Sequence, residues 1–191
     1  MKAKHLFIGE YIDKSPKDRI YQLLDNYRCF TRYLDSYKEN VVNLMLAMRE
    51  YYISPSEEEL GVRVQTTRGT SDITASKAID RVELEECFEK MRVTKELFPD
   101  PEELRLISTA VFEWNLMGKE YRILSGFIDM MQPDDRSIFV PYIKREKRVS
   151  EIAADQNVEW DSANKKVYRI RKALIEEVMP WFNEYKVSVP A

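Results

Sequence analysis

Apolar residues recur every seven positions across the first quarter of the chain. One seam position holds Ile20, Tyr27, Leu34, Val41 and Met48, and the other holds Leu23, Phe30, Tyr37, Leu44 and Tyr51. This repeat is typical of a long helix that supercoils against another helix. Ser15-Pro16 marks its start, because Ser accepts from free amides and Pro is tolerated at the first helical position. The many tyrosines favour an antiparallel hairpin or bundle within the chain, with a parallel dimer as the alternative.

The pattern beyond residue 53 predicts further helices separated by Gly and Pro. Residues 53–69 are expected to form a loop, with a short strand as an option at 62–65. A second helix is expected from about residue 71 to 98, where Pro99 and Pro101 end it. Its apolar residues lie on two opposite faces, which predicts burial on both sides. These faces are Ala75, Ala78, Ile79 and Val82, and opposite them Leu84, Cys87, Phe88 and Met91. A third helix is expected over 102–117, with Gly118 separating it from a fourth over 121–131.

The last section of the chain has a different pattern. It predicts a short helix over 134–144, a second short helix over 149–156 and a long helix over 160–179. Asn157 stands at the sharp turn, and Asn tolerates the left-handed backbone better than any residue but Gly. Ala153 is small enough to let the two helices cross closely. The expected apolar wedge between them is Ile152, Val158, Ala163 and Val167. Together these features predict a helix-turn-helix.

Charge is distributed unevenly along the chain. The net charge is −3, but residues 136–191 hold eleven Lys or Arg against eight Asp or Glu. Residues 1–135 hold nineteen basic residues against twenty-five acidic ones. A basic C-terminal end on an acidic body is typical of a polyanion-binding protein, and ordinary surface scatter is the alternative.

The outer face of the expected last helix carries donors suited to DNA. Lys165, Lys166, Arg169 and Lys172 recur there at helical spacing, and Arg171 is expected on the same face. Lys and Arg bind phosphates or guanine edges, and Asn164 can pair with adenine. Arg148 belongs to a basic cluster over 144–148, which either clamps backbone phosphate or forms a solvated connector. Trp160 either stacks on DNA or packs against its own domain.

Residues 151–174 resemble region 4 of sigma-70-type factors without a gap. The resemblance implies DNA contacts from Asp161, Ser162, Asn164, Lys165 and Tyr168. The whole layout, with the stretch 64–85, also resembles phage late-gene transcriptional activators of the RinA/ArpU type. Some positions depart from the region 4 pattern. Asn157 replaces the usual turn Gly, Gln156 a buried aliphatic residue, Glu159 a small hydroxyl cap, and the bulky Trp160 follows it.

Several classes of function lack the residues that they need. Two cysteines and one histidine cannot build a zinc cluster or a disulfide framework, and there is no phosphate-binding loop or nucleophile elbow. We therefore expect no enzymatic activity, no cofactor and no metal. No apolar run approaches the length of a membrane span, and the N-terminus does not predict a signal peptide. These features predict a cytoplasmic protein that does not enter a membrane.

The sequence thus predicts an all-α protein with two parts. Residues 1–132 are expected to form a bundle of long coiled-coil-like helices for dimerisation or partner binding, and residues 133–191 the sigma-region-4-like helix-turn-helix. The predicted function is sequence-specific binding of double-stranded DNA by a transcriptional regulator of phage or prophage origin. RNA polymerase and a second copy of the chain are the further partners considered. The alternatives are a small-terminase-like DNA-packaging protein and a protein-interaction adaptor.

Overall fold

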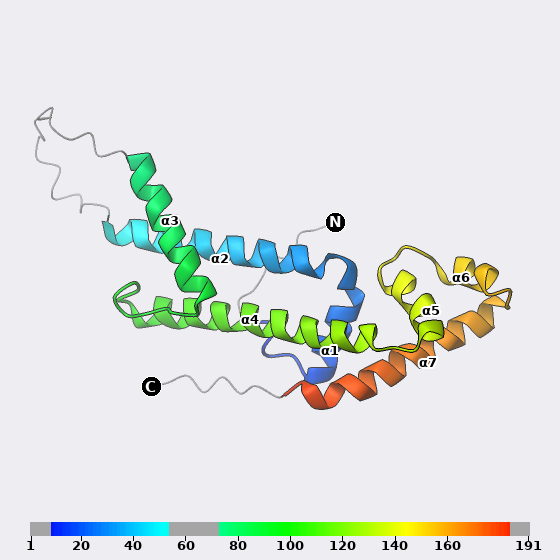
Figure 1. Ribbon diagram of the computed structural model, residues 1–191. Helices are drawn as coiled ribbons and strands as arrows, with labels where there is room; N and C mark the ends of the chain where they lie inside the picture. The colour runs from blue at the N-terminus through cyan, green and yellow to red at the C-terminus, as the bar shows by residue number, and fades with distance from the viewer. Residues whose placement is uncertain (1–8, 54–72, 184–191) are drawn as a thin grey trace, which may run out of the picture. The chain divides into compact units, whose positions relative to one another are not determined.

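The computed structural model describes residues 9–53 and 73–183, and these are helical throughout apart from turns and connections (Figure 1). The chain divides into two units. Unit 1 is Met1–Leu34 with Asn115–Ala191, and unit 2 is Asp35–Trp114. The elements are α1 (Pro16–Asp25), η1 (Tyr27–Cys29), α2 (Phe30–Ile53), α3 (Ile73–Glu89), α4 (Pro101–Asp129), α5 (Pro133–Ile143), α6 (Val149–Asp155), α7 (Trp160–Val178) and η3 (Met179–Trp181). The all-α expectation is confirmed for the described residues. The strand considered at 62–65 lies outside them.

The expected single helix from residue 16 onward is broken. Ser15 caps α1 as predicted, since its Oγ accepts the Asp18 N–H at 3.2 Å. At the other end α1 stops at Asn26, whose backbone leaves the helical region (φ −111°, ψ 11°) and whose Nδ2 donates to the Gln22 carbonyl at 2.8 Å. The chain then makes the 3₁₀ turn η1 before α2 begins at Phe30. The seven-residue repeat does not predict this break, because the break depends on the backbone conformation of Asn26.

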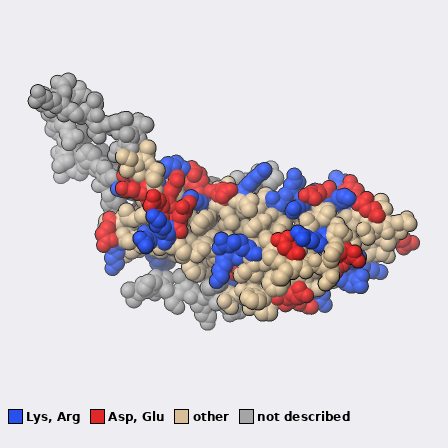
Figure 2. Space-filling model, viewed as in Figure 1, with Lys and Arg blue, Asp and Glu red and all other residues tan. Residues whose placement is uncertain are grey.

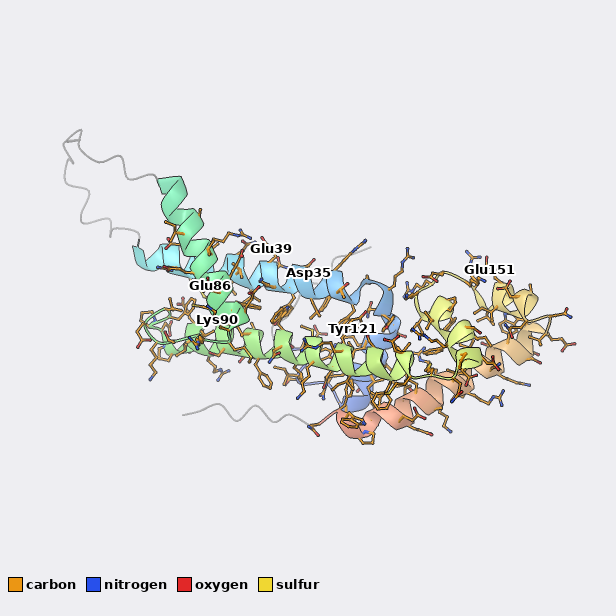
Figure 3. The ribbon with its side chains drawn as sticks, in the orientation of Figure 1. Asp35, Glu39, Glu86, Lys90, Tyr121 and Glu151 are labelled. Atoms are coloured by element: carbon orange, nitrogen blue, oxygen red, sulfur yellow. The ribbon has the colours of Figure 1, made fainter. Side chains whose placement is uncertain are left out.

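The seam residues nevertheless form packed surfaces. Ile20, Leu23, Phe30, Tyr37 and Val41 are buried, whereas Tyr27, Leu34, Leu44 and Met48 are half-buried. In unit 1 the rings of Tyr27 and Phe30 lie 5.3 and 5.2 Å from that of Tyr121 on α4, which is labelled in Figure 3. Aromatic contacts at this spacing add to the free energy of apolar burial. The side chain of Tyr51 lies outside the described residues.

Unit 2 packs α2 against α3 and the first half of α4. Phe88 of α3 is fully buried and meets Trp114 edge to face at 5.0 Å. The hydroxyl of buried Tyr37 donates to the Glu113 carboxylate at 2.6 Å. Ion pairs join α2 to α3 along their exposed edges: Lys38–Glu89, Arg49–Asp80, Arg49–Glu83 and Arg81–Glu39. Figure 2 shows acidic side chains gathered over α3.

Two expectations about α3 are wrong. The helix ends at Glu89 and not near residue 98, because Met91 takes a left-handed backbone (φ 54°) and the Arg92 N–H turns back to the Cys87 carbonyl at 2.9 Å. Among the described side chains of α3, only one of the two predicted faces is buried. Ile79 and Val82 are 61% and 57% exposed, while Leu84 and Phe88 are fully buried.

Helix α4 runs without interruption through Gly118, so the predicted separation into two helices is wrong. A glycine inside a helix lowers its stability by only about 0.5–1 kcal/mol. Apolar residues on both sides of Gly118 outweigh that cost, because Leu116, Met117 and Leu124 are buried.

Unit 1 brings both ends of the described chain together around a buried ion pair. Arg19 of α1 is fully buried and holds the Glu120 carboxylate of α4 with Nε and Nη2, both at 3.0 Å. The Tyr11 hydroxyl donates to the same carboxylate at 2.7 Å. Nη2 of Arg19 also donates to the Asn183 carbonyl, just beyond η3, at 2.6 Å. Unit 1 therefore includes α1, and the division of the chain into units differs from the predicted boundary after residue 132.

Candidate nucleic-acid interface

The helices expected in the last section occupy nearly the predicted residues. α5 covers Pro133–Ile143, α6 Val149–Asp155 and α7 Trp160–Val178. α7 packs on both α6 and α5. Glu151, labelled in Figure 3, fixes the start of α6 by accepting the Arg148 N–H at 2.6 Å. The inner face of α6 is Ile152 and Ala153, both buried.

The turn between α6 and α7 depends on Asn157, as the sequence predicts. Its φ is 51°, in the left-handed region. The Val158 N–H donates to the Ala153 carbonyl at 3.0 Å, and the Asn157 N–H to the Ala154 carbonyl at 3.1 Å. This pair of bonds is a Schellman motif, which ends a helix abruptly. The prediction that Val158 re-enters the core is wrong, because this side chain is 46% exposed. The motif directs it outward.

α7 has one apolar face and one polar face. The buried residues recur at helical spacing: Ala163, Val167, Ile170, Leu174, Ile175 and Val178. At 100° per residue, the direction opposite to this face falls near Lys165, Arg169 and Lys172. α5 and α6 pack against α7 (Figure 1). On the opposite side of α7, Lys165, Arg169 and Lys172 are exposed.

The predicted contact residues lie on the surface of this unit. Trp160 is 53% and Tyr168 68% exposed, so the Trp is not packed into its domain. The exposed ones are Arg148, Trp160, Asp161, Ser162, Asn164, Lys165, Tyr168, Arg169 and Lys172, and Lys166 is half-buried. Nine of these ten residues lie on one helix, and Arg148 precedes α6.

The cations of this face differ in how far they are already neutralised. Among the described residues, Lys165 and Arg169 have no acidic partner within ion-pair distance. Lys166 stands 4.0 Å from Asp135, and Lys172 stands 3.9 Å from Glu176. Exposed pairs at such distances contribute little free energy, so a phosphate can displace them. Two carboxylates, Glu159 and Asp161, are exposed at the start of the same helix.

The basic cluster at 144–148 is mostly engaged within the unit. Lys147 pairs with Asp155 at 2.6 Å, and this hydrogen bond raises the pKa of the lysine. Arg145 donates to the Asp25 carbonyl at 3.0 Å. Lys144 is half-buried. Among the described residues, Arg148 is the cation of this cluster whose exposed side chain has neither a hydrogen-bond nor an ion-pair partner.

One cation of α7 does not point outward. Arg171, which the sequence places with the polar face, pairs with Asp25 of α1 at 2.7 Å and lies 5.2 Å from the Tyr21 ring. Its position along α7 falls beside the apolar face, one turn after Val167, and this spacing is the signal that could have separated it from Lys172.

No protein-family model, curated protein or solved structure matches this chain. No helix in the described ranges is both long and apolar enough to cross a bilayer. Within those ranges, no three residues of the metal-ligating types His, Cys, Asp and Glu lie close enough together to hold a metal ion.

Proposed function

We propose that the protein binds double-stranded DNA through α6 and α7 as a helix-turn-helix and regulates transcription. The observation that carries this proposal is the outward ridge of α7, where Lys165 and Arg169 are exposed without an acidic partner among the described residues. A helix of this width fits the major groove of B-DNA. Its buried face is fixed by α5 and α6, so the ridge presents its donors in one orientation.

The charges indicate how the helix would lie on DNA. Glu159 and Asp161 repel phosphates at the start of α7, and Glu176 and Glu177 do so near its end. Between them lie Lys165, Lys166, Arg169 and Lys172. We therefore place the phosphate contacts on the middle turns of α7, with Arg148 as a further contact before α6. Asn164 and Tyr168 are the exposed side chains left to reach base edges.

Salt-dependent binding tests the proposal directly. The probe is a fluorescent random-sequence duplex, titrated by anisotropy between 50 and 300 mM salt. Log affinity falls linearly with log salt, and each lost phosphate contact reduces the magnitude of this slope by about 0.9. Replacing Lys165, Lys166 and Arg169 with Ala should therefore weaken binding and reduce the magnitude of the slope by about 2 to 3.

A charge-matched variant controls for general electrostatics. Arg92, Lys95 and Arg105 are exposed in unit 2, and their replacement with Ala removes the same charge. This control should keep the salt slope of the wild type. Equal loss in both variants, or no salt-dependent binding by the wild type, would contradict the proposal.

A protein-interaction adaptor is the second candidate, and Glu159 and Asp161 are the observation that favours it. A helix that no longer binds DNA and binds a protein instead tolerates carboxylates at its exposed start. Absence of DNA binding at 50 mM salt would support this function.

A DNA-packaging protein would bind DNA and also assemble into rings, which light scattering measures. For the regulator we propose unit 2 as the surface for RNA polymerase or a second copy.

A further inference from the structure

Asp25, the last residue of α1, contacts two elements of the candidate DNA-binding unit at once. Its carboxylate accepts from Nη2 of Arg171, in the middle of α7, at 2.7 Å. Its main-chain carbonyl accepts from Nη2 of Arg145, in the turn between α5 and α6, at 3.0 Å. All three residues belong to unit 1. A single residue therefore links α1 to α7 and to the turn that precedes α6.

Arg171 is held by two residues of α1, one against a face of its guanidinium and one at its edge. Its guanidinium lies 5.2 Å from the ring of Tyr21, which is one turn before Asp25 on α1, and the Asp25 carboxylate meets it at the edge. The Nε atom of Arg171 is buried without a hydrogen-bond partner among the described residues. A buried N–H without a partner costs stability, so this arrangement is not the most stable use of the site. It does fix where the side chain lies.

Arg145 is fixed by its backbone as well as by its side chain. Its φ is 55°, and the Glu146 N–H donates back to the Pro141 carbonyl at 2.8 Å, which closes a Schellman motif at the end of α5. The Arg145 guanidinium then reaches a carbonyl at the end of α1, where helix carbonyls lack partners and negative charge accumulates. The end of α1 thereby bonds to the turn that sets the direction of α6.

We propose that Asp25 is a positioning residue for DNA binding. Through Arg171 and Arg145 it sets the orientation of α7 and α6 relative to α1, and it does not touch DNA itself. This inference rests on the proposed function. The Asp25 side chain is 59% exposed, and an ion pair so exposed adds little to global stability. DNA affinity should therefore respond to its loss far more than folding does.

The sign of the effect separates positioning from competition. Removing a carboxylate normally raises affinity for a polyanion, and if Asp25 merely competed with phosphate for Arg171, Asp25→Asn would bind DNA more tightly. Positioning predicts the opposite, a loss of about fivefold or more. Asp13→Asn is the matched control, because Asp13 is an exposed acid in the same unit and the charge change is the same. It should leave affinity equal or slightly higher.

Arg171→Met gives a second, independent readout. Positioning predicts a comparable loss of affinity with an unchanged salt slope, since no phosphate contact disappears. A slope smaller in magnitude by about 0.9 would mean that Arg171 binds phosphate, and would overturn the inference. The double variant of Asp25→Asn and Arg171→Met should bind no more weakly than either single variant. Additive losses would overturn the inference too.

Failure of this inference is distinguishable from failure of the proposed function. The anisotropy titrations use the full chain with the random-sequence duplex, and thermal unfolding of each variant confirms folding. Asp25→Glu keeps the charge and should recover most of the affinity that Asp25→Asn loses. If Asp25→Asn binds like the wild type while the Lys165, Lys166 and Arg169 replacement still weakens binding, only the role of Asp25 is refuted. If the wild type does not bind DNA, both proposals fail.

Discussion

Each nitrogen of the buried Arg19 guanidinium donates a hydrogen bond. Nη1 donates to the Lys14 carbonyl at 2.8 Å, Nη2 reaches Asn183, and Nε and Nη2 clasp Glu120. Both partners of the ion pair are at most 2% exposed. Charges removed from water to this extent are tolerated only when each one is paired and hydrogen-bonded.

Removing one partner should therefore be far more damaging than removing both. Arg19→Met leaves the Glu120 carboxylate buried without a counter-ion and should lower the free energy of unfolding by about 3–5 kcal/mol. Combining it with Glu120→Leu and Tyr11→Phe should restore a large part of this loss. Urea unfolding measures each value, and a loss below about 1 kcal/mol for Arg19→Met would show that the pair is not desolvated.

Tyr11 makes the stability of unit 1 depend on pH in the alkaline range, where stability falls as the pH rises. Burial raises the pKa of its hydroxyl far above the usual value, and the neighbouring Glu120 carboxylate raises it further. The unfolded chain releases this proton near pH 10 and the folded chain keeps it. The contribution of Tyr11 is thus complete below pH 10 and is lost as pH rises above it, by about 1.4 kcal/mol per pH unit.

Urea unfolding of the wild type and Tyr11→Phe from pH 8.5 to 11 isolates this contribution. The other tyrosines and the lysines titrate in both proteins, so only the difference between the two curves matters. The variant should be less stable below pH 10, and the gap should narrow as pH rises. Two parallel curves would mean that Tyr11 ionises in the folded protein as it does in water.

At the scale of elements, periodicity predicts helices better than it predicts their ends. The ranges of α6 and α7 follow from the sequence, because their turn needs a left-handed residue and Asn157 supplies it. The effects of Asn26 and Gly118 on helix boundaries do not follow from the sequence in the same way. α1 ends where the backbone of Asn26 leaves the helical region, which no spacing reveals, and Gly118 lies within α4 although Gly usually marks a boundary.

The candidate site was predictable to a similar extent. Exposure of Lys165, Tyr168 and Arg169 follows from the apolar spacing of α7 alone. The same spacing sets Arg171 beside the apolar face, but it does not identify the partner of this arginine, because Asp25 lies 146 residues earlier in the chain. Local patterns cannot report an ion pair between residues so far apart.

Gly118 offers a way to strengthen α4. A Cβ built at this residue would lie 3.9 Å from Leu34 Cδ1, which is ordinary van der Waals contact. Gly118→Ala should therefore raise the free energy of unfolding by about 0.5–1 kcal/mol, since it removes the extra backbone freedom of glycine. Urea unfolding measures the change.

A bulkier substitution is the matched control for this prediction. Gly118→Leu introduces the same helix preference with a side chain that must enter the contact with Leu34, and it should destabilise unit 1. A loss of stability in Gly118→Ala as well would show that α4 and Leu34 are packed more tightly there than van der Waals contact.

At the scale of the molecule, unit 1 is built from two distant parts of the chain. Unit 2, Asp35–Trp114, is inserted between them, and both crossings fall inside helices, α2 and α4. The contacts that close unit 1 join residues 101 and 164 positions apart: Arg19 to Glu120 and Arg19 to Asn183. A fragment that begins at residue 133 would lack α1 and every one of these contacts.

A peptide of residues 133–191 should consequently fail to unfold cooperatively. Its helices would lose the contact between α1 and η3 and the ring contact of Trp181 with Phe127, as well as the Asp25 and Arg19 bonds. Circular dichroism on heating should show a broad, gradual loss of helix where the full chain shows a sharp transition. A sharp transition of the peptide near that of the full chain would contradict the division into units.

The bond between Arg19 and Asn183 also has a consequence for synthesis on the ribosome. α1 leaves the exit tunnel early, yet the carbonyl that completes its arginine belongs to a residue 164 positions later in the chain. Until then the nascent chain exposes the apolar side of α1, the seam residues Ile20 and Leu23 among them. The bond that completes the Arg19 site therefore cannot form until residue 183 has left the tunnel, and unit 1 stays incomplete for that part of translation.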